Sequence, residues 1–142
     1  MSFTYEYERP VVTTDIICYT DTHILLIKRK NEPFKGMWAL PGGYVNIDER
    51  VRDGAMRELK EETGLSSDLD FRYEGFHDEV YRDPRSRAYT HAFSCYYNVQ
   101  PEAVAGDDAS ECGWFHTMDI MNNMELAFDH KSIILESELG TW

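Results

Sequence analysis

The chain has 142 residues, of which 42% are hydrophobic and 13% aromatic. This composition suits one folded domain, predicted over residues 1–142, and the length is too short for two comfortable ones. The formal net charge of −12 argues against a purely electrostatic grip on nucleic acid, which needs clustered Lys and Arg. No run approaches the roughly 20 apolar residues of a membrane helix, and no export signal is visible, so we expect a cytoplasmic protein that binds neither nucleic acid nor membrane.

Two β-branched, apolar runs begin the predicted structure. Residues 11–20 and 23–30 are separated by a turn-like patch and are predicted to form two strands of a hairpin. Residues 31–45 are interrupted by several Pro and Gly residues, which predicts a tightly turning loop. A helix of about fifteen residues is predicted next, with Asp48 as its N-cap and Gly64 as its C-terminal stop.

The second half of the chain alternates strand-like runs with turns. Strands are predicted over residues 71–83, 88–100 and 111–120, and a closing helix over residues 129–139. Asp129 and His130 are candidates to cap that helix, with Asp129 as the N-cap. The order strand, strand, helix, strands, helix indicates an α/β or α+β sandwich. The three cysteines are far apart and lack CxxC spacing, so we expect free, small hydrophobic residues.

The first predicted helix carries an unusual group of acids. At about 100° per residue, Val51, Ala55, Glu58 and Glu62 fall within one narrow arc, with Glu61 beside it. The acids therefore lie against the buried edge of the helix rather than on its solvated side. Gathered carboxylates repel each other and take up protons unless positive charge compensates them.

Two sources of compensating charge are available. Arg57 lies four residues before Glu61, a spacing that permits an ion pair. Hard divalent cations such as Mg²⁺ or Mn²⁺ prefer carboxylate oxygens, main-chain carbonyls and water. Because Mg²⁺ is commonly shared with substrate phosphates, the cluster predicts a site for a diphosphate, which water would attack at phosphorus.

The spacing from Gly43 through Glu49 to the run between Arg57 and Leu65 resembles the Nudix box, G-x5-E-x7-R-E-U-x-E-E-x-G-U with U aliphatic, at every fixed position. The resemblance implies a Nudix fold of the α/β (α+β) class, with a mixed β-sheet sandwiched between helices. It also implies hydrolysis of a nucleoside diphosphate linked to another group.

The resemblance further assigns roles within the box. It implies that divalent metal is bound by three carboxylates and one main-chain carbonyl, those of Glu58, Glu61, Glu62 and Gly42. In the same resemblance, Arg57 orients the glutamates and Glu49 steadies the loop and helix.

Three flanking segments resemble the ADP-ribose pyrophosphatase branch of the family and its related ADP-ribose-sensing domains: ERPVVTTD, RDPRSR and LAFDHKSII. Arg82 and Arg85 form a basic island suited to phosphate or ribose oxygens, or else a turn held by surface ion pairs. Arg29, at the end of the second strand, is a further phosphate candidate. Four aromatic residues are candidates to stack on adenine: Trp38, Tyr44, Tyr81 and Phe128.

The general base is expected to lie outside the Nudix box. Asp107, Asp108 and Glu111 are the acids in the loop before Trp114, and Glu111 is the first choice among them. If none of these side chains reaches the metals, the base is expected to be Glu61.

Three hypotheses for the function remain open. The first is a Mg²⁺- or Mn²⁺-dependent enzyme that splits ADP-ribose into AMP and ribose 5-phosphate. The second is a domain that senses ADP-ribose without turnover, and the third is a Nudix enzyme for a sugar nucleotide, a dinucleotide or an oxidised nucleoside triphosphate. Similar pyrophosphatases are often homodimers, for which Trp142 and the Tyr-rich N-terminal segment offer apolar surface.

Overall fold

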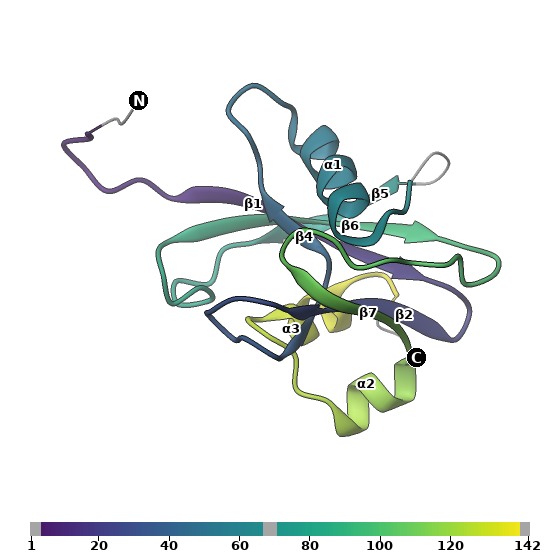
Figure 1. Cartoon of the computed structure of the whole chain (residues 1–142). Coiled ribbons are helices and arrows are strands. Elements are labelled where there is room, and N and C mark those ends of the chain that lie inside the picture. The colour runs from purple at the N-terminus through teal and green to yellow at the C-terminus, as the bar shows by residue number, and fades with distance from the viewer. Residues whose placement is uncertain (1–3, 67–70, 140–142) are drawn as a thin grey trace.

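The computed structural model describes residues 4–66 and 71–139, so Trp142 lies outside the described residues. In this part of the chain a seven-stranded mixed sheet is combined with three helices (Figure 1). The strands are β1 (Val11–Tyr19), β2 (His23–Arg29), β3 (Trp38–Ala39), β4 (Gly42–Tyr44), β5 (Phe71–His77), β6 (Ala88–Tyr96) and β7 (Ala109–His116). The helices are α1 (Val51–Thr63), α2 (Thr117–Asn123) and α3 (His130–Glu136).

Strand β1 lies at the centre of the sheet. It pairs in parallel with β6 along its whole length and antiparallel with β4. The predicted hairpin of β1 and β2 is confirmed at its turn, where Tyr19 lies opposite Ile24. Beyond that turn the two strands diverge, and β2 pairs instead with β7 and β3.

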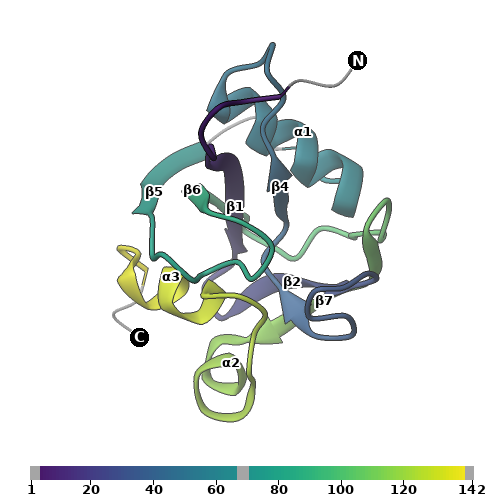
Figure 2. The ribbon, with the colours of Figure 1, turned by 90° about the vertical axis from the view of Figure 1, so that its left-hand side faces the viewer.

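The helices cover both faces of the sheet (Figure 2). On one face Ile16 packs in a core cluster with Leu59 of α1. On the other face Ile17 packs with Ile120 of α2 and Ile133 of α3. Neighbouring residues of a strand point to opposite faces, so β1 serves both clusters. The predicted sandwich of a mixed sheet between helices is confirmed. No helix in the described residues is long and apolar enough to cross a bilayer.

Helix α1 begins later than predicted. Its N-cap residue is Arg50, in an extended conformation and without a side-chain cap, so the prediction of Asp48 as N-cap is wrong. The cause lies in the preceding turn, where the carboxylate of Glu49 accepts the main-chain N–H of Asn46 at 2.7 Å. That bond holds residues 46–49 as a turn and delays the start of the helix.

Two further helix boundaries follow local chemistry. Gly64 ends α1 in the left-handed conformation, with φ of 75°, as predicted. The strand predicted over residues 111–120 is wrong in its second half, because β7 ends at His116 and α2 follows. The Nδ1 atom of His116 accepts the main-chain N–H of Met118 and so caps α2.

Strands β5 and β6 are shorter than predicted. They end at His77 and Tyr96, and residues 78–87 form turns and a loop rather than strand. Within this loop the carboxylate of Asp83 accepts the main-chain N–H of Arg85 at 2.9 Å. This local bond offers the backbone a turn in place of a sheet ladder.

Candidate active site

The loop that contains β4 lies directly against helix α1. Gly43 pairs with Thr14 of β1, which fixes the loop on the sheet. A Cβ atom at Gly43 would come within 2.6 Å of the carboxyl carbon of Glu58. A larger residue at this position would therefore require the carboxylate of Glu58 to move away from the loop.

Arg57 binds several groups of the box with one guanidinium. Its Nη2 and Nε atoms donate to the two oxygens of Glu49 at 2.7 and 3.0 Å. Its Nη1 atom donates to Glu58 at 2.9 Å and to Glu61 at 3.0 Å, and Nη2 also reaches the carbonyl of Tyr44. Hydrogen bonds from Arg57 and from a main-chain N–H lower the pKa of Glu49 to about 2. Arg57 thus links the loop to the glutamates, in line with the orienting role that the resemblance implies.

Glu62 is the most buried of these acids, with 4% of its surface exposed. Its Oε1 atom accepts the main-chain N–H of Gly42 at 2.7 Å. Burial raises its pKa well above the ordinary value, and the charges of Glu58 and Asp108 add to the increase. Burial likewise raises the pKa of Glu58. Burial and mutual repulsion make the ionised forms of these carboxylates unfavourable, and a bound cation would compensate their charge.

The chemistry of these side chains fits a hard divalent cation. Carboxylate and carbonyl oxygens are the ligands that Mg²⁺ and Mn²⁺ prefer. The candidate ligands are Glu58, Glu61, Glu62 and the carbonyl of Gly42. Within the described residues no three acidic, His or Cys side chains already converge as a ready-made ligand set. The reason is visible in the contacts, because Arg57 holds Glu58 and Glu61 while Gly42 holds Glu62.

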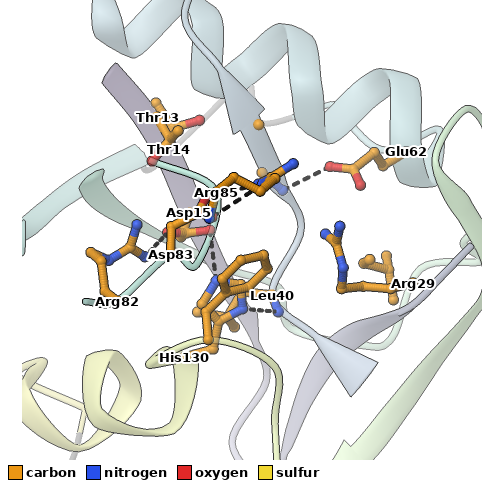
Figure 3. Close-up of a pocket in the computed structure, with 14 residues that line it drawn as sticks. Thr13, Thr14, Asp15, Arg29, Leu40, Glu62, Arg82, Asp83, Arg85 and His130 are labelled. Atoms are coloured by element: carbon orange, nitrogen blue, oxygen red, sulfur yellow. Dashed lines mark hydrogen bonds and ion pairs between the residues drawn. The ribbon is translucent and has the colours of Figure 1, made fainter. Parts of the chain in front are cut away.

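A cleft opens beside Glu62, between β1, β2, the β4 loop, the loop before β6 and the start of α3 (Figure 3). Arg29 and Arg85 both line it, and their guanidinium carbons lie 4.9 and 5.8 Å from the ring centroid of Phe128. Burial and the charge of Arg85 lower the pKa of Arg29. Arg85 is paired with Asp83 at 2.9 Å, whereas Arg29 has no ion-pair partner among the described residues. Two like charges on one ring favour an anion between them.

Arg82 lies deeper, in a buried ion-pair network. It donates to Asp129 at 2.8 Å and to Asp15 at 3.3 Å, and its side chain is 4% exposed. Asp129 stands at the N-cap position of α3, but its side chain makes no capping bond and binds Arg82 instead, so its predicted capping role is wrong. The role of Arg82 in substrate binding stays a prediction, because its contacts in the structure are with acids of the protein itself.

Two members of this network, Asp15 and His130, were not assigned to the site from the sequence; Asp15 had no predicted role, and His130 was considered only as a cap of the closing helix. Asp15 is 6% exposed and His130 4%, and their side chains are 3.1 Å apart. Burial would raise the pKa of Asp15, but His130, Arg82 and Thr90 together lower it. The sequence did contain a signal for Asp15, since it is an acid within an apolar strand. A charge buried in this way requires polar or charged partners.

The loop acids are distributed differently from the sequence-based expectation. The main-chain N–H of Gly106 donates to the carbonyl of Glu62, which brings the loop onto the end of α1. Asp108 lies close enough to raise the pKa of Glu58 and of Glu62. Glu111 lies on β7 and pairs with Lys28 at 3.2 Å on the surface. Glu111 as general base stays a prediction, and Asp108 is the loop acid that the structure brings to the glutamates.

A second groove adjoins the cleft and shares Arg82 and Phe128 with it. Its other lining residues include Phe34, Val80 and Tyr81, and the side chain of Tyr81 is almost fully exposed. Phe34 and Phe128 contact each other edge to face, with ring centroids 4.8 Å apart. The groove offers an aromatic surface next to the two arginines of the cleft.

The fold and this acidic site match a known family. Residues 9–136 match the model described as the NUDIX domain, and the chain therefore belongs to the Nudix family. It is a Nudix hydrolase, and among its relatives is an ADP-ribose pyrophosphatase of Methanocaldococcus jannaschii, 44% identical over 90% of this chain and 73% of that protein.

Two other relatives are a transcriptional repressor and a bifunctional enzyme. The ADPR responsive transcriptional repressor NtrR of Acinetobacter baylyi is 29% identical over 93% of this chain and 54% of that protein. The crystal structure of a bifunctional NMN adenylyltransferase/ADP ribose pyrophosphatase of Francisella tularensis, complexed with AMP and a manganese ion, is 32% identical, with a TM-score of 0.85. The structural match covers 93% of this chain and 43% of the Francisella chain. This chain therefore spans about half the length of the repressor and of the bifunctional enzyme.

Proposed function

We propose that this Nudix hydrolase splits ADP-ribose into AMP and ribose 5-phosphate and requires Mg²⁺ or Mn²⁺. The observation that supports it best is the cleft itself, in which the buried carboxylate of Glu62 and the guanidiniums of Arg29 and Arg85 line the same space. Carboxylates suit metal ions, and the arginines suit phosphate oxygens. A diphosphate with its metal complements both sets of charges.

The reaction adds water across the bond between the two phosphates. The oxygen of water forms a new bond to one phosphorus as the bridging P–O bond breaks, and a carboxylate accepts the proton. When bound, the divalent cation supplies positive charge that neutralises phosphate oxygens and lowers the pKa of water. Glu58, Glu61, Glu62 and the Gly42 carbonyl would hold it. Arg57 keeps Glu58 and Glu61 oriented, and Arg29 and Arg85 bind the anionic substrate.

The aromatic groove provides a place for the adenine base. Tyr81, Phe34 and Phe128 present apolar ring surface next to the arginine pair, and planar bases stack well on such rings. The relatives support the choice of ADP-ribose, because the archaeal protein is an ADP-ribose pyrophosphatase and the repressor is ADPR responsive.

A second candidate is a sensor that binds ADP-ribose without cutting it. The similarity to the Acinetobacter repressor favours this reading. The complete set of box acids, with Glu62 buried beside the Gly42 loop, favours catalysis instead. A third candidate keeps the enzyme and replaces ADP-ribose with another nucleoside diphosphate derivative.

The test is product release from a panel of ADP-ribose, ADP-glucose, NADH, diadenosine polyphosphate and 8-oxo-dGTP, each with Mg²⁺, Mn²⁺ or chelator. We expect AMP from ADP-ribose well ahead of the other substrates and only with metal. A different preferred substrate would replace ADP-ribose and keep the enzyme. Binding of ADP-ribose without turnover of any compound would make the sensor the correct reading.

A further inference from the structure

The segment Leu40–Gly42 is held at three consecutive residues. The main-chain N–H of Leu40 donates to Nδ1 of His130 at 2.9 Å, and the carbonyl of Pro41 accepts from Ile16 at 2.8 Å. The N–H of Gly42 donates to Glu62 at 2.7 Å (Figure 3). The Glu62 carboxylate is therefore held by a loop that is anchored both by its pairing with β1 and, two residues before Gly42, by His130.

His130 is itself fixed by the carboxylate of Asp15, which lies behind it. Because Nδ1 accepts a hydrogen bond, the proton of the neutral ring lies on Nε2, which faces Oδ1 of Asp15 at 3.1 Å. The other oxygen of Asp15 accepts from Thr90 at 2.7 Å and from Arg82 at 3.3 Å. The imidazole thus has one orientation and one tautomer, set by residues of β1, β6 and the loop before β6.

We infer that His130 is a positioning residue of the active site, acting through Leu40 and Gly42 on the carboxylate of Glu62. The inference rests on the proposed function for the chemistry and on the hydrogen bonds for the coupling. His130 lines the cleft, but both ring nitrogens are engaged, one with Leu40 and one with Asp15. It therefore has no free nitrogen with which to act on substrate itself.

We expect the turnover rate to be sensitive to His130 because the path from its side chain to that of Glu62 is short. Only Pro41 separates the residue that His130 holds from the residue that holds Glu62. Displacements of about 1 Å at a catalytic group lower rates by about 100-fold in other enzymes. Loss of the Leu40 bond is therefore expected to lower kcat rather than raise KM, because the substrate-binding arginines are not on this path.

The test uses three substitutions that separate the two bonds of the imidazole. His130→Asn places an amide oxygen near the position of Nδ1 and retains an acceptor for Leu40. His130→Gln reaches toward the position of Nε2, retains the contact with Asp15 and loses the acceptor. His130→Ala removes both, and His23→Gln, at the far end of β2, controls for the substitution itself.

For ADP-ribose with Mn²⁺ we expect kcat to fall about ten-fold or more in His130→Gln and His130→Ala, and less than about three-fold in His130→Asn, with KM nearly unchanged. Melting temperatures of the Asn and Gln variants are expected to be similar. Equal kcat values for these two variants, or losses that simply follow their melting temperatures, would overturn the positioning role.

Amide hydrogen exchange tests the coupling without turnover. In His130→Gln the N–H groups of both Leu40 and Gly42 should exchange faster than in the parent, and in His130→Asn both should stay protected. Unchanged exchange at Gly42 in the Gln variant would disprove the path to Glu62. If the parent protein fails to cut ADP-ribose, the proposed function fails, but this measurement still decides the inference.

Discussion

The Oε1 atom of Glu62 lies 2.7 Å from the main-chain nitrogen of Gly42, twenty residues away in sequence. A buried carboxylate is thus anchored by the loop whose carbonyl is expected to share its metal. Glutamine in place of Glu62 keeps the acceptor for Gly42 and removes the charge.

For Glu62→Gln we therefore expect kcat to fall at least about 100-fold, since loss of outer ligands alone often costs 10–100-fold. Stability without metal should be unchanged or higher, because the buried charge is gone. Steady-state kinetics and melting with chelator measure both effects. A kcat within a few-fold of the parent would remove Glu62 from the ligand set.

The raised pKa values of Glu58 and Glu62 predict the pH dependence of stability in the absence of metal. A carboxyl group whose pKa is raised by folding binds its proton more tightly in the folded state. Its contribution to the stability of the folded state is fully present below the ordinary glutamate pKa of about 4.3. That contribution is lost as the pH rises through the pKa of the folded state.

We therefore expect Mn²⁺ or Mg²⁺ to raise the melting temperature more strongly as pH increases, because the metal binds the ionised acids. The Glu62→Gln variant should lose most of this increase. Melting curves over a pH series, with metal and with chelator, provide the measurement. A metal effect independent of pH would contradict the assignment.

Substrate binding by Arg29 is tested by replacing it with alanine. Arg29 has no ion-pair partner among the described residues, and its Nε atom donates to the carbonyl of Pro33 at 2.7 Å, so its positive charge remains available to a bound anion. We expect KM for ADP-ribose to rise about 10-fold or more, as for loss of a hydrogen bond to a charged group. Lys30→Ala, an exposed cation one residue further along, is the control and should change KM little. Equal effects of both changes would indicate only long-range attraction.

Arg82 and Arg85 should behave differently although they are three residues apart. Arg82→Ala leaves the carboxylates of Asp15 and Asp129 without their cation, which is expected to cost about 3–5 kcal/mol of unfolding free energy. Arg85→Ala removes a partly exposed guanidinium from the buried carboxylate of Asp83, which keeps its hydrogen bond from the main-chain N–H of residue 85, and should cost less, about 1–2 kcal/mol. Urea unfolding of both variants measures this. A stable Arg82→Ala with raised KM would instead support direct substrate binding.

The acids of the loop before β7 are compared through Asp108→Asn and Glu111→Gln. Asp108 lies near enough to Glu58 and Glu62 to influence their pKa values, whereas Glu111 is paired with Lys28 on the surface. We expect kcat to fall further in Asp108→Asn than in Glu111→Gln. The reverse order would establish Glu111 as the general base predicted from the sequence.

The sandwich and the glutamate face of α1 were predictable because they depend on local periodicity. The β-branched, apolar run of β1 predicts a strand from its composition, and the arc shared by Ala55, Glu58 and Glu62 follows from helix geometry alone. The start of α1 and the end of β7 were not, because each is set by one side chain, Glu49 or His116, that competes for a main-chain N–H.

The ion-pair network behind the cleft could not be predicted from the sequence for a different reason. Asp15, Arg82 and His130 are far apart in sequence and meet only through the pairing of β1 with β6 and the packing of α3. The acidic partners of Arg82, Asp15 and Asp129, lie outside the segment at 82–85, so nothing in that segment indicated them.

The same network has a consequence during synthesis of the chain. A ribosome that has translated as far as α2 has completed the whole Nudix box, the sheet and the cleft arginines, but not His130 or Asp129. Until α3 emerges, Asp15 and Arg82 lack two of their partners and the Leu40 N–H lacks its acceptor. The site should therefore become fully active only after α3 has docked.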